Sequence, residues 1–203
     1  MTAPPATFTP PRTNPFATRF TRPGRVVPLD ADGRPLDLDA LLARLRALGG
    51  RAAIEGPHGS GKTSLLTALA AHLDARGGAT RLIRVRGGAE AGGLLRAIAR
   101  AAAGAFVGVD GWESLPWPVA TAARWLAARR GCGLVVTAHR ATSLPVLHRC
   151  HTSSLVLARI VAQLPDHRGA IDDGDVADAF ARHAGDLREA LYDLYDRFER
   201  RAG

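Results

Sequence analysis

The feature of this sequence that most constrains its fold is the stretch at residues 56–63, which reads Gly-Pro-His-Gly-Ser-Gly-Lys-Thr. The pattern G-x-x-x-x-G-K-T is that of the phosphate-binding P-loop. An apolar stretch at 52–54 leads into it, and residues 64–73 leave it with apolar positions at helical spacing. The sequence therefore predicts a strand, a glycine-rich loop and a helix in succession, which is the context that this motif needs.

Each part of the loop has a physical task in binding a phosphate chain. Its glycines let the backbone turn N–H groups inward at the positive end of the following helix. The Lys62 ammonium is predicted to reach the outer phosphates, and the Thr63 hydroxyl to hold Mg²⁺. The residues predicted to contact the nucleotide here are Gly56, Pro57, His58, Gly59, Ser60, Gly61, Lys62, Thr63 and Ser64.

Lysine usage supports this interpretation. The chain has 27 lysines and arginines, and Lys62 is its only lysine. A compact ammonium is therefore kept at the one position where a planar guanidinium would not fit a nest of backbone amides. We predict ATP rather than GTP as the ligand, because the guanine-recognition motif Asn-Lys-x-Asp would need a second lysine.

The length of 203 residues suits one α/β domain with an appendage. Cys132 and Cys150 form neither a C-x-x-C motif nor a disulfide framework, which is typical of a reducing cytosol. No apolar signal segment or membrane span is evident. These observations predict a cytoplasmic protein that does not enter a membrane.

The formal net charge of +8 is unevenly spread along the chain. Residues 1–165 carry a net charge of +12, and residues 166–203 a net charge of −4. Such a basic body is able to attract nucleic acid, or the two parts are able to attract each other. Scattered arginines more often form a solvated face, which is the interpretation that we favour.

Composition divides the chain into three parts. Residues 1–28 are rich in Pro, Thr and Arg and are predicted to form an extended arm, residues 29–164 the nucleotide-binding core, and residues 165–203 a helical, lid-like segment. Phe16 and Phe20 lie among cations in the arm. One hypothesis places one of these rings against the adenine, and the hypothesis that we favour makes both rings anchors of the arm.

Two buried strands are predicted to end in polar residues at the same edge of a parallel sheet. The apolar run at 105–110 ends at Asp110, whose carboxylate would orient the water shell of Mg²⁺ beside Thr63. The run at 134–137 ends at Thr137, followed closely by His139 and Arg140. Because ligands bind at the carboxyl ends of such strands, these side chains are predicted to face the γ-phosphate. The alternative is an ordinary polar exit from a strand.

The remaining segments are predicted to be structural. Helices are expected at 37–48, 89–103, 118–130, 153–164, 173–183 and 186–201, with a second strand at 80–86 and a short fifth strand within 144–151. His148, Cys150 and His151 suggest a zinc site, but a structural site needs four ligands and no second Cys/His pair is near.

These motifs together resemble those of AAA+ ATPases and the related STAND ATPases. The P-loop, the strand that ends at Asp110, the strand that ends at Thr137 and a helical segment with Gly185-Asp186-Leu187-Arg188 carry the resemblance. It implies a three-layer α/β/α P-loop NTPase with a parallel five-stranded sheet and a short C-terminal helical lid. In these families a further strand lies between the P-loop strand and the strand that bears the Mg²⁺-binding acid.

Residue roles follow from the same resemblance. The sequence at 109–113, Val-Asp-Gly-Trp-Glu, is similar to the Asp-Gly-apolar-acid form of the NACHT group within the STAND ATPases, so Glu113 would position the attacking water. The sequence at 136–140, Val-Thr-Ala-His-Arg, is similar to their sensor strand, so Arg140 would contact the γ-phosphate. Arg188 matches the sensor 2 arginine, which reaches the nucleotide from the lid. The predicted catalytic residues are Lys62, Glu113, Arg140 and Arg188.

The predicted function is that of an ATP-binding protein that hydrolyses ATP slowly, with Mg²⁺, and acts as a molecular switch for an unidentified protein partner. No arginine finger for a neighbouring subunit is evident, and that group is typically worth ~10³–10⁵ in rate. One alternative is a non-hydrolysing module that couples nucleotide to a protein or DNA partner. Another is a kinase for a small molecule or nucleotide, which would need an arginine-rich lid where residues 112–130 form mainly one apolar helix.

Overall fold

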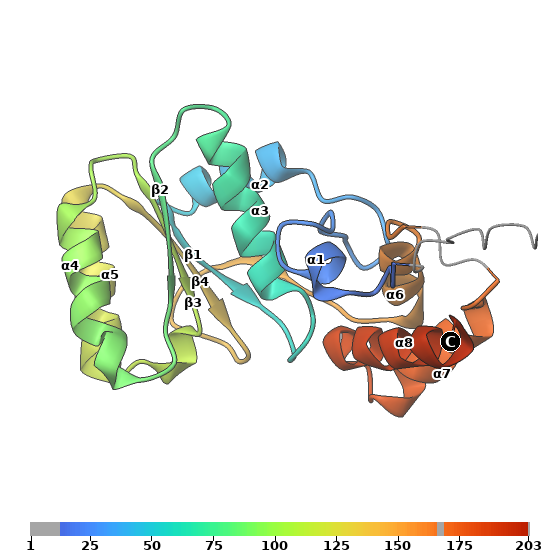
Figure 1. Ribbon diagram of the computed structural model, residues 1–203. Helices are drawn as coiled ribbons and strands as arrows, with labels where there is room; N and C mark the ends of the chain where they lie inside the picture. The colour runs from blue at the N-terminus through green and yellow to red at the C-terminus, as the bar shows by residue number, and fades with distance from the viewer. Residues whose placement is uncertain (1–12, 166–168, 203) are drawn as a thin grey trace, which may run out of the picture.

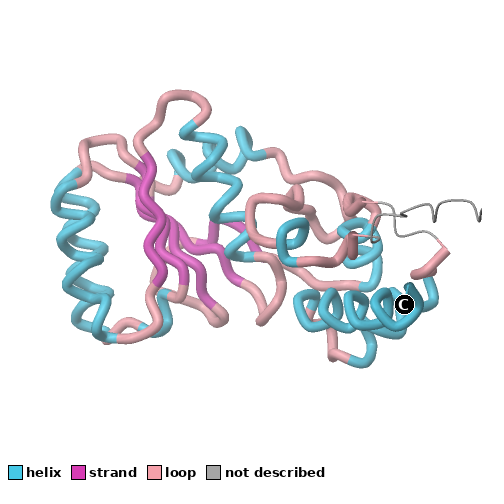
Figure 2. Tube along the Cα trace, viewed as in Figure 1, coloured by secondary structure: helices cyan, strands magenta, loops and turns pink. Residues whose placement is uncertain are grey.

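The computed structural model describes residues 13–165 and 169–202. Residues 1–12 of the predicted arm, residues 166–168 and residue 203 lie outside the described residues. Within the described part the chain folds around a single sheet, with helices on both of its faces and a group of helices at one side (Figures 1 and 2).

The sheet has five parallel strands in the order β2-β3-β4-β1-β5. Strand β4 lies between the P-loop strand β1 and strand β3, which is the additional strand that the resemblance implied. The predicted α/β architecture with a five-stranded parallel sheet is therefore confirmed. The strands are β1 (Arg51–Glu55), β2 (Thr80–Arg84), β3 (Phe106–Asp110), β4 (Gly133–Ala138) and β5 (Val146–Arg149).

Helices cover both faces of the sheet, which gives three layers. One face packs against α4 and α5, and the other against α2 and α3 (Figure 1). The helices are α1 (Thr18–Thr21), α2 (Leu38–Ala47), α3 (Lys62–Asp74), α4 (Ala91–Arg100), α5 (Trp117–Arg130), α6 (Ser154–Val161), α7 (Asp173–Arg182) and α8 (Leu187–Ala202), with 3₁₀ turns at Gly88–Glu90 and Trp112–Ser114.

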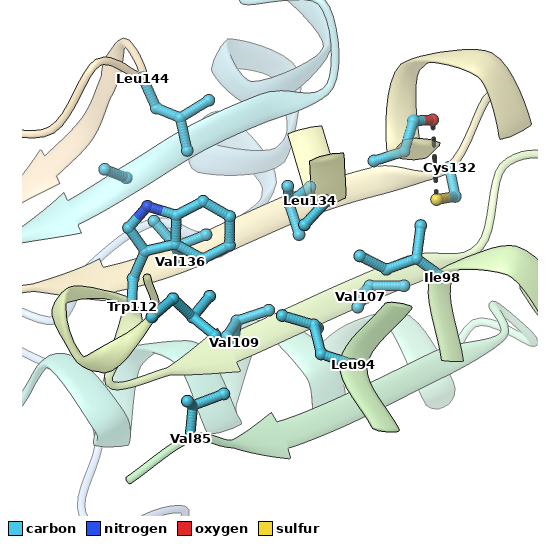
Figure 3. Close-up of a cluster of buried hydrophobic side chains, with 14 of the residues drawn as sticks. Val85, Leu94, Ile98, Val107, Val109, Trp112, Cys132, Leu134, Val136 and Leu144 are labelled. Carbon is cyan, nitrogen blue, oxygen red and sulfur yellow. Dashed lines mark hydrogen bonds between the residues drawn. The ribbon is translucent and has the colours of Figure 1, made fainter. Parts of the chain in front are cut away.

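The core residues explain why the central strands are continuous apolar runs. Val107 and Leu134 are fully buried beneath α4 and α5, where Trp112 lies over the ends of β3 and β4 (Figure 3). Ile54 is fully buried on the opposite face, in the cluster to which α2 and α3 contribute. A parallel sheet with both faces covered needs apolar side chains at successive positions rather than at alternate ones.

Helix ends follow the capping residues that the sequence contains. The Asp37 carboxylate accepts a hydrogen bond from the Ala40 amide at 2.9 Å, which makes Asp37 the N-cap of α2. Ser153 caps α6 in the same way, through Val156. These caps satisfy amides that would otherwise have no partner in the first turn of each helix.

The C-terminal helices and the arm form one cluster beside the sheet. Helices α6, α7 and α8 share a buried apolar cluster with Phe16, whose ring is 2% exposed and lies 6.4 Å from that of Phe198. The Asn14 amide donates to the Tyr195 carbonyl at 3.0 Å and to Glu199 at 2.7 Å. The arm is therefore anchored by Phe16, and it contains the short helix α1 rather than being extended throughout.

An ion-pair network centred on the buried Asp175 side chain joins α7 to α8. Asp175 accepts two hydrogen bonds from Arg201, at 2.5 and 2.8 Å, and one from Arg197 at 3.2 Å. Asp175 is buried, and it also accepts from the Asp172 amide as part of a capping box. The hydrogen bonds from Arg201, together with those from Asp172 and Arg197, hold the pKa of Asp175 well below its usual range.

Replacing Asp175 with Asn is expected to lower the free energy of unfolding by about 3 kcal/mol at neutral pH, because it leaves two guanidinium groups without their shared carboxylate. The folded-state pKa lies below the unfolded value of about 3.9, so the stabilisation is present above about pH 4 and is lost as the pH falls further. Urea unfolding at pH 7 and pH 3 measures both effects, with Asp196→Asn on the exposed side of α8 as control. Equal losses in the two variants at pH 7 would contradict this account.

Candidate nucleotide-binding site

The P-loop connects the carboxyl end of β1, which lies between β4 and β5, to the first turn of α3. Gly59 and Gly61 have φ values of +66° and +86°, which side chains other than that of glycine rarely adopt. Gly61 is the N-cap of α3, and Lys62 and Thr63 begin the helix. The loop therefore surrounds the amino end of α3, where unpaired amides and the helix dipole favour an anion.

The loop lies directly against the start of α8. A Cβ atom added to Gly59 would lie 1.8 Å from Oδ1 of Asp186, so only glycine fits there. The same oxygen of Asp186 accepts hydrogen bonds from the amides of Arg188 at 2.9 Å and Glu189 at 3.2 Å, at the amino end of α8. The phosphate loop and the C-terminal helices are thus in direct contact.

Lys62 is buried at the base of this loop. Its ammonium donates hydrogen bonds to the carbonyls of Gly56 at 2.8 Å and Pro57 at 2.5 Å, and to Nδ1 of His139 at 3.0 Å. Burial lowers the pKa of Lys62, while the charges of Glu113 and other neighbours oppose that shift. All three ammonium protons therefore have acceptors, and the side chain is held beside the loop amides.

Thr63, Asp110 and Thr137 meet at the carboxyl edge of the sheet. The hydroxyls of Thr63 and Thr137 both donate to Oδ1 of Asp110 at 2.8 Å, and the Gly111 amide donates to the Thr137 hydroxyl at 3.0 Å. Three elements distant in sequence, α3, β3 and β4, thus bring these oxygens together. The other oxygen of Asp110 pairs with Nε of Arg84, on β2, at 3.2 Å.

The donor set fits Mg²⁺. A threonine hydroxyl beside a carboxylate supplies the hard oxygen ligands that Mg²⁺ prefers, and the metal usually takes its remaining ligands from phosphates and water. Among residues 13–165 and 169–202, no group of three or more His, Cys, Asp or Glu side chains could hold a metal ion. His148, Cys150 and His151 therefore do not form such a group. Burial raises the pKa of the Cys150 thiol to about 11, which favours the protonated form rather than the thiolate that binds a metal.

His139 links Lys62 to Glu113. Its Nδ1 accepts from Lys62, and its Nε2 lies 3.0 Å from Oε1 of Glu113, while its ring stacks on that of His58 at 3.5 Å. Burial and the Lys62 charge lower the pKa of His139, which favours the neutral ring with its proton on Nε2. The imidazole therefore connects the phosphate-binding cation to the carboxylate predicted to position water.

A cavity of about 520 Å³ extends from the P-loop between the sheet and the C-terminal helices. The P-loop, Lys62, Asp110 and Arg188 line it. The arm, α6 and α8 also contribute to the lining, with polar side chains such as Arg22 and with the apolar side chains of Pro23, Val26, Val27, Val156, Ile160, Leu187 and Leu191. A volume of this size, lined by both charged and apolar side chains, suits a nucleotide.

The structure brings most of the predicted site residues together. Residues 58–64, Asp110, Glu113, Thr137 and Arg188 line the cavity, and Gly56 and Pro57 hold Lys62 through their carbonyls. Arg140 is exposed and is not among the residues that line the cavity, whereas His139 is. Phe16 and Phe20 are not part of the lining either, since their rings pack in the C-terminal cluster.

Some residues of the site were not identified from the sequence. The sequence predicts Arg84 only as part of a strand, although its place at the carboxyl end of β2 is a signal that it lies near the ligand. The sequence places Asp186 at the start of a helix and in the segment that carries the resemblance, with no role in the site. Val26 and Val27 of the arm also line the cavity. The sequence around them does not differ from that of a linker, so it does not indicate a binding role.

Comparison with known proteins does not show a family for this chain. No family model and no curated protein matches the sequence. A solved structure of PCH-2 from C. elegans is similar in fold, with 13% sequence identity and a TM-score of 0.45 over 81% of this chain and 68% of that chain. At this level of similarity the functional assignment depends on the residues of the cavity itself.

Proposed function

We propose that this protein binds ATP with Mg²⁺ in the cavity beside the P-loop and hydrolyses it slowly, as a switch. One contact carries this proposal: the Thr63 hydroxyl donates a hydrogen bond to the Asp110 carboxylate at 2.8 Å. This contact lies beside the glycine-rich loop that contains the only lysine of the sequence. A P-loop alone indicates phosphate binding. A hydroxyl paired with a carboxylate at the same point adds the metal ligands that a triphosphate needs.

Binding requires a rearrangement around Lys62. Its ammonium now donates to two loop carbonyls and to His139, and it would exchange at least one of these hydrogen bonds for phosphate oxygens. The amides at the start of α3 would bind the remaining oxygens. When bound, Mg²⁺ neutralises charge on the outer phosphates. Thr63 would hold it through its hydroxyl oxygen, and Asp110 would hold its water shell.

The apolar part of the cavity lining is the place proposed for the adenine. Val26 from the arm, Ile160 from α6 and Leu191 from α8 belong to it, and the packing of the arm in the C-terminal cluster brings these elements together. A nucleotide that spans the cavity would contact the P-loop at one end and the arm and lid helices at the other. Such contact, together with the Asp186–Gly59 approach, supports a role as a switch.

Glu113 is the carboxylate proposed to position the attacking water. It lies in the 3₁₀ turn after β3, lines the cavity and is held by Nε2 of His139 at 3.0 Å. Glu113 must move away from His139, or share this contact, before it acts as a base. That requirement supports slow turnover. Arg188, at the start of α8, is proposed to stabilise charge on the outer phosphates from the side of the lid.

Replacing Glu113 with Gln is expected to lower ADP release at least about 100-fold while ATP affinity changes little, because only the base that activates water is lost. A coupled ADP assay and an ATP titration measure the two effects. Glu189→Gln, on the exposed side of α8, is the matched control and should behave as wild type.

Three other outcomes would change the assignment. Tight ATP binding without ADP release by the wild type would favour the non-hydrolysing module. ADP release that depends on an added acceptor would favour a kinase. Unchanged ADP release by Glu113→Gln would contradict the role of Glu113.

A further inference from the structure

Two of the three tryptophans lie exposed on one side of α5. Trp117 is 79% exposed and Trp125 is 63% exposed, whereas Trp112 is buried in the core. They are eight residues apart on the helix, and Thr121 lies between them, so all three share one stripe of its surface. Large indole rings exposed together on a helix are typical of a contact surface rather than of a solvated face.

Helix α5 is positively charged around these rings. It contains three arginines, at positions 124, 129 and 130, and no Asp or Glu. The Arg129 guanidinium lies 5.7 Å from the centroid of the Trp125 ring. Helix α4, beside α5 in Figure 1, also has no acidic residue.

A cleft beside this stripe combines both features. It has a volume of about 400 Å³, and the residues that form it include Trp125, Leu48, Leu144 and Pro145 together with Arg51 and Arg124. Arg51 begins β1 and Pro145 precedes β5, so the cleft lies at the amino ends of these strands. The P-loop lies at their carboxyl ends. The cleft and the nucleotide cavity are therefore separate sites, one at the amino ends of the strands and the other at their carboxyl ends. We name the stripe and the cleft together the α5 surface.

A two-fold dimer of this chain does not complement the α5 surface. In such a dimer the same face meets itself, so arginines would face arginines. Asp175, Asp178 and Asp193 of the C-terminal helices are not available as partners either, since they already pair with Arg197. An occupant that complements this surface supplies both negative charge and flat apolar surface.

We propose that the α5 surface binds single-stranded nucleic acid. Guanidinium groups at Arg51, Arg124 and Arg129 suit phosphate oxygens, which they bind with two parallel hydrogen bonds. The exposed faces of Trp117 and Trp125 suit unpaired bases, whose stacking on aromatic rings tolerates any sequence. A double helix would offer the phosphates but not the base faces.

The test uses a fluorescein-labelled 20-nucleotide oligo-dT and the full chain, with fluorescence anisotropy at 50 mM salt. Trp117→Ala and Trp125→Ala are each expected to weaken binding about 5- to 100-fold, the loss expected for one stacked base. Leu155→Ala, which removes an exposed apolar side chain from α6, is the matched control and should bind as wild type. Circular dichroism checks that each variant is folded.

Salt dependence separates the electrostatic part of the binding. The double variant Arg51→Gln and Arg129→Gln is expected to reduce the slope of log Kd against log salt by about 1.4, which is about 0.7 for each phosphate that the variant no longer neutralises. Arg200→Ala, at the end of α8, removes a charge elsewhere and should leave the slope unchanged.

The proposal is independent of the ATP site. Lys62→Ala should therefore retain oligo-dT binding, and excess ATP should not displace the oligonucleotide. The proposal is overturned if the wild type does not bind oligo-dT, if the two tryptophan variants bind it as the wild type does, or if Lys62→Ala abolishes binding. Two further results would overturn the proposal. One is that the protein binds anionic lipid vesicles through Trp117 and Trp125 and does not bind oligo-dT. The other is that the wild type forms a dimer that Trp117→Ala or Trp125→Ala dissociates.

Discussion

Lys62→Ala is expected to weaken ATP binding at least about 100-fold while the protein stays folded. The ammonium is the only lysine side chain in the molecule, and it lies buried beside the amides that begin α3. Each hydrogen bond from a charged donor to phosphate contributes ~1.5–3 kcal/mol, and two such bonds account for a 100-fold loss. Isothermal titration calorimetry with ATP and Mg²⁺ measures the loss, and thermal unfolding checks the fold.

Lys62→Arg is the informative companion to this variant. It keeps the charge but replaces the compact ammonium with a larger, planar guanidinium group. That group would have to fit among the carbonyls of Gly56 and Pro57 and the ring of His139. We expect it to bind ATP nearly as poorly as Lys62→Ala. If Lys62→Ala binds ATP within about threefold of the wild type, the cavity is not a P-loop nucleotide site.

Asp110→Asn is expected to abolish the enhancement of ATP binding by Mg²⁺ and to lower ADP release at least about 100-fold. The asparagine has the same shape and is able to accept a hydrogen bond from Thr63, but it has no charge with which to hold the metal. In EDTA the variant should bind ATP as well as the wild type or better, because a negative charge near the phosphates is removed.

Paired titrations with ATP in Mg²⁺ and in EDTA separate these effects. Asp32→Asn, in the exposed turn before α2, is the control and should show the enhancement of the wild type. An Asp110→Asn variant that keeps this enhancement would contradict the assignment of Asp110 as a metal ligand.

The sequence was sufficient to predict the central strands and the site at their carboxyl ends. Asp110 and Thr137 each follow an apolar run, and adjacent parallel strands place such residues side by side. The structure brings their oxygens within 2.8 Å. The position of β4 between β1 and β3 could not be derived from hydrophobic pattern, because strand order depends on how the crossover helices pack. It came from the resemblance to known ATPases.

Contacts between segments distant in sequence could not be predicted. Side chains alternate along a strand, and small changes where it ends decide which of them points into the cavity. His139 lines the cavity there and Arg140 does not, which a spacing argument cannot distinguish. The approach of Asp186 to Gly59 depends on the docking of a whole helix, and no local pattern encodes it.

Helix ends were also less predictable than helix positions. The apolar and alanine-rich segment at 89–103 predicts one helix, but the structure has a 3₁₀ turn at Gly88–Glu90 and helix α4 only at Ala91–Arg100. Residues 101–103 leave the helix despite their high helix propensity, because the chain must turn there to enter β3. Packing of the following strand thus overrides the local preference.

The central claim is that Lys62 binds the phosphates of a nucleotide, and the composition of the chain allows a direct test. An amine-reactive acylating reagent has only two targets, the Lys62 side chain and the α-amino group, and mass spectrometry quantifies each separately. We predict that ATP with Mg²⁺ strongly slows acylation of Lys62 and leaves that of the α-amino group unchanged. Acylation of Lys62 at the same rate with and without saturating ATP would contradict the account.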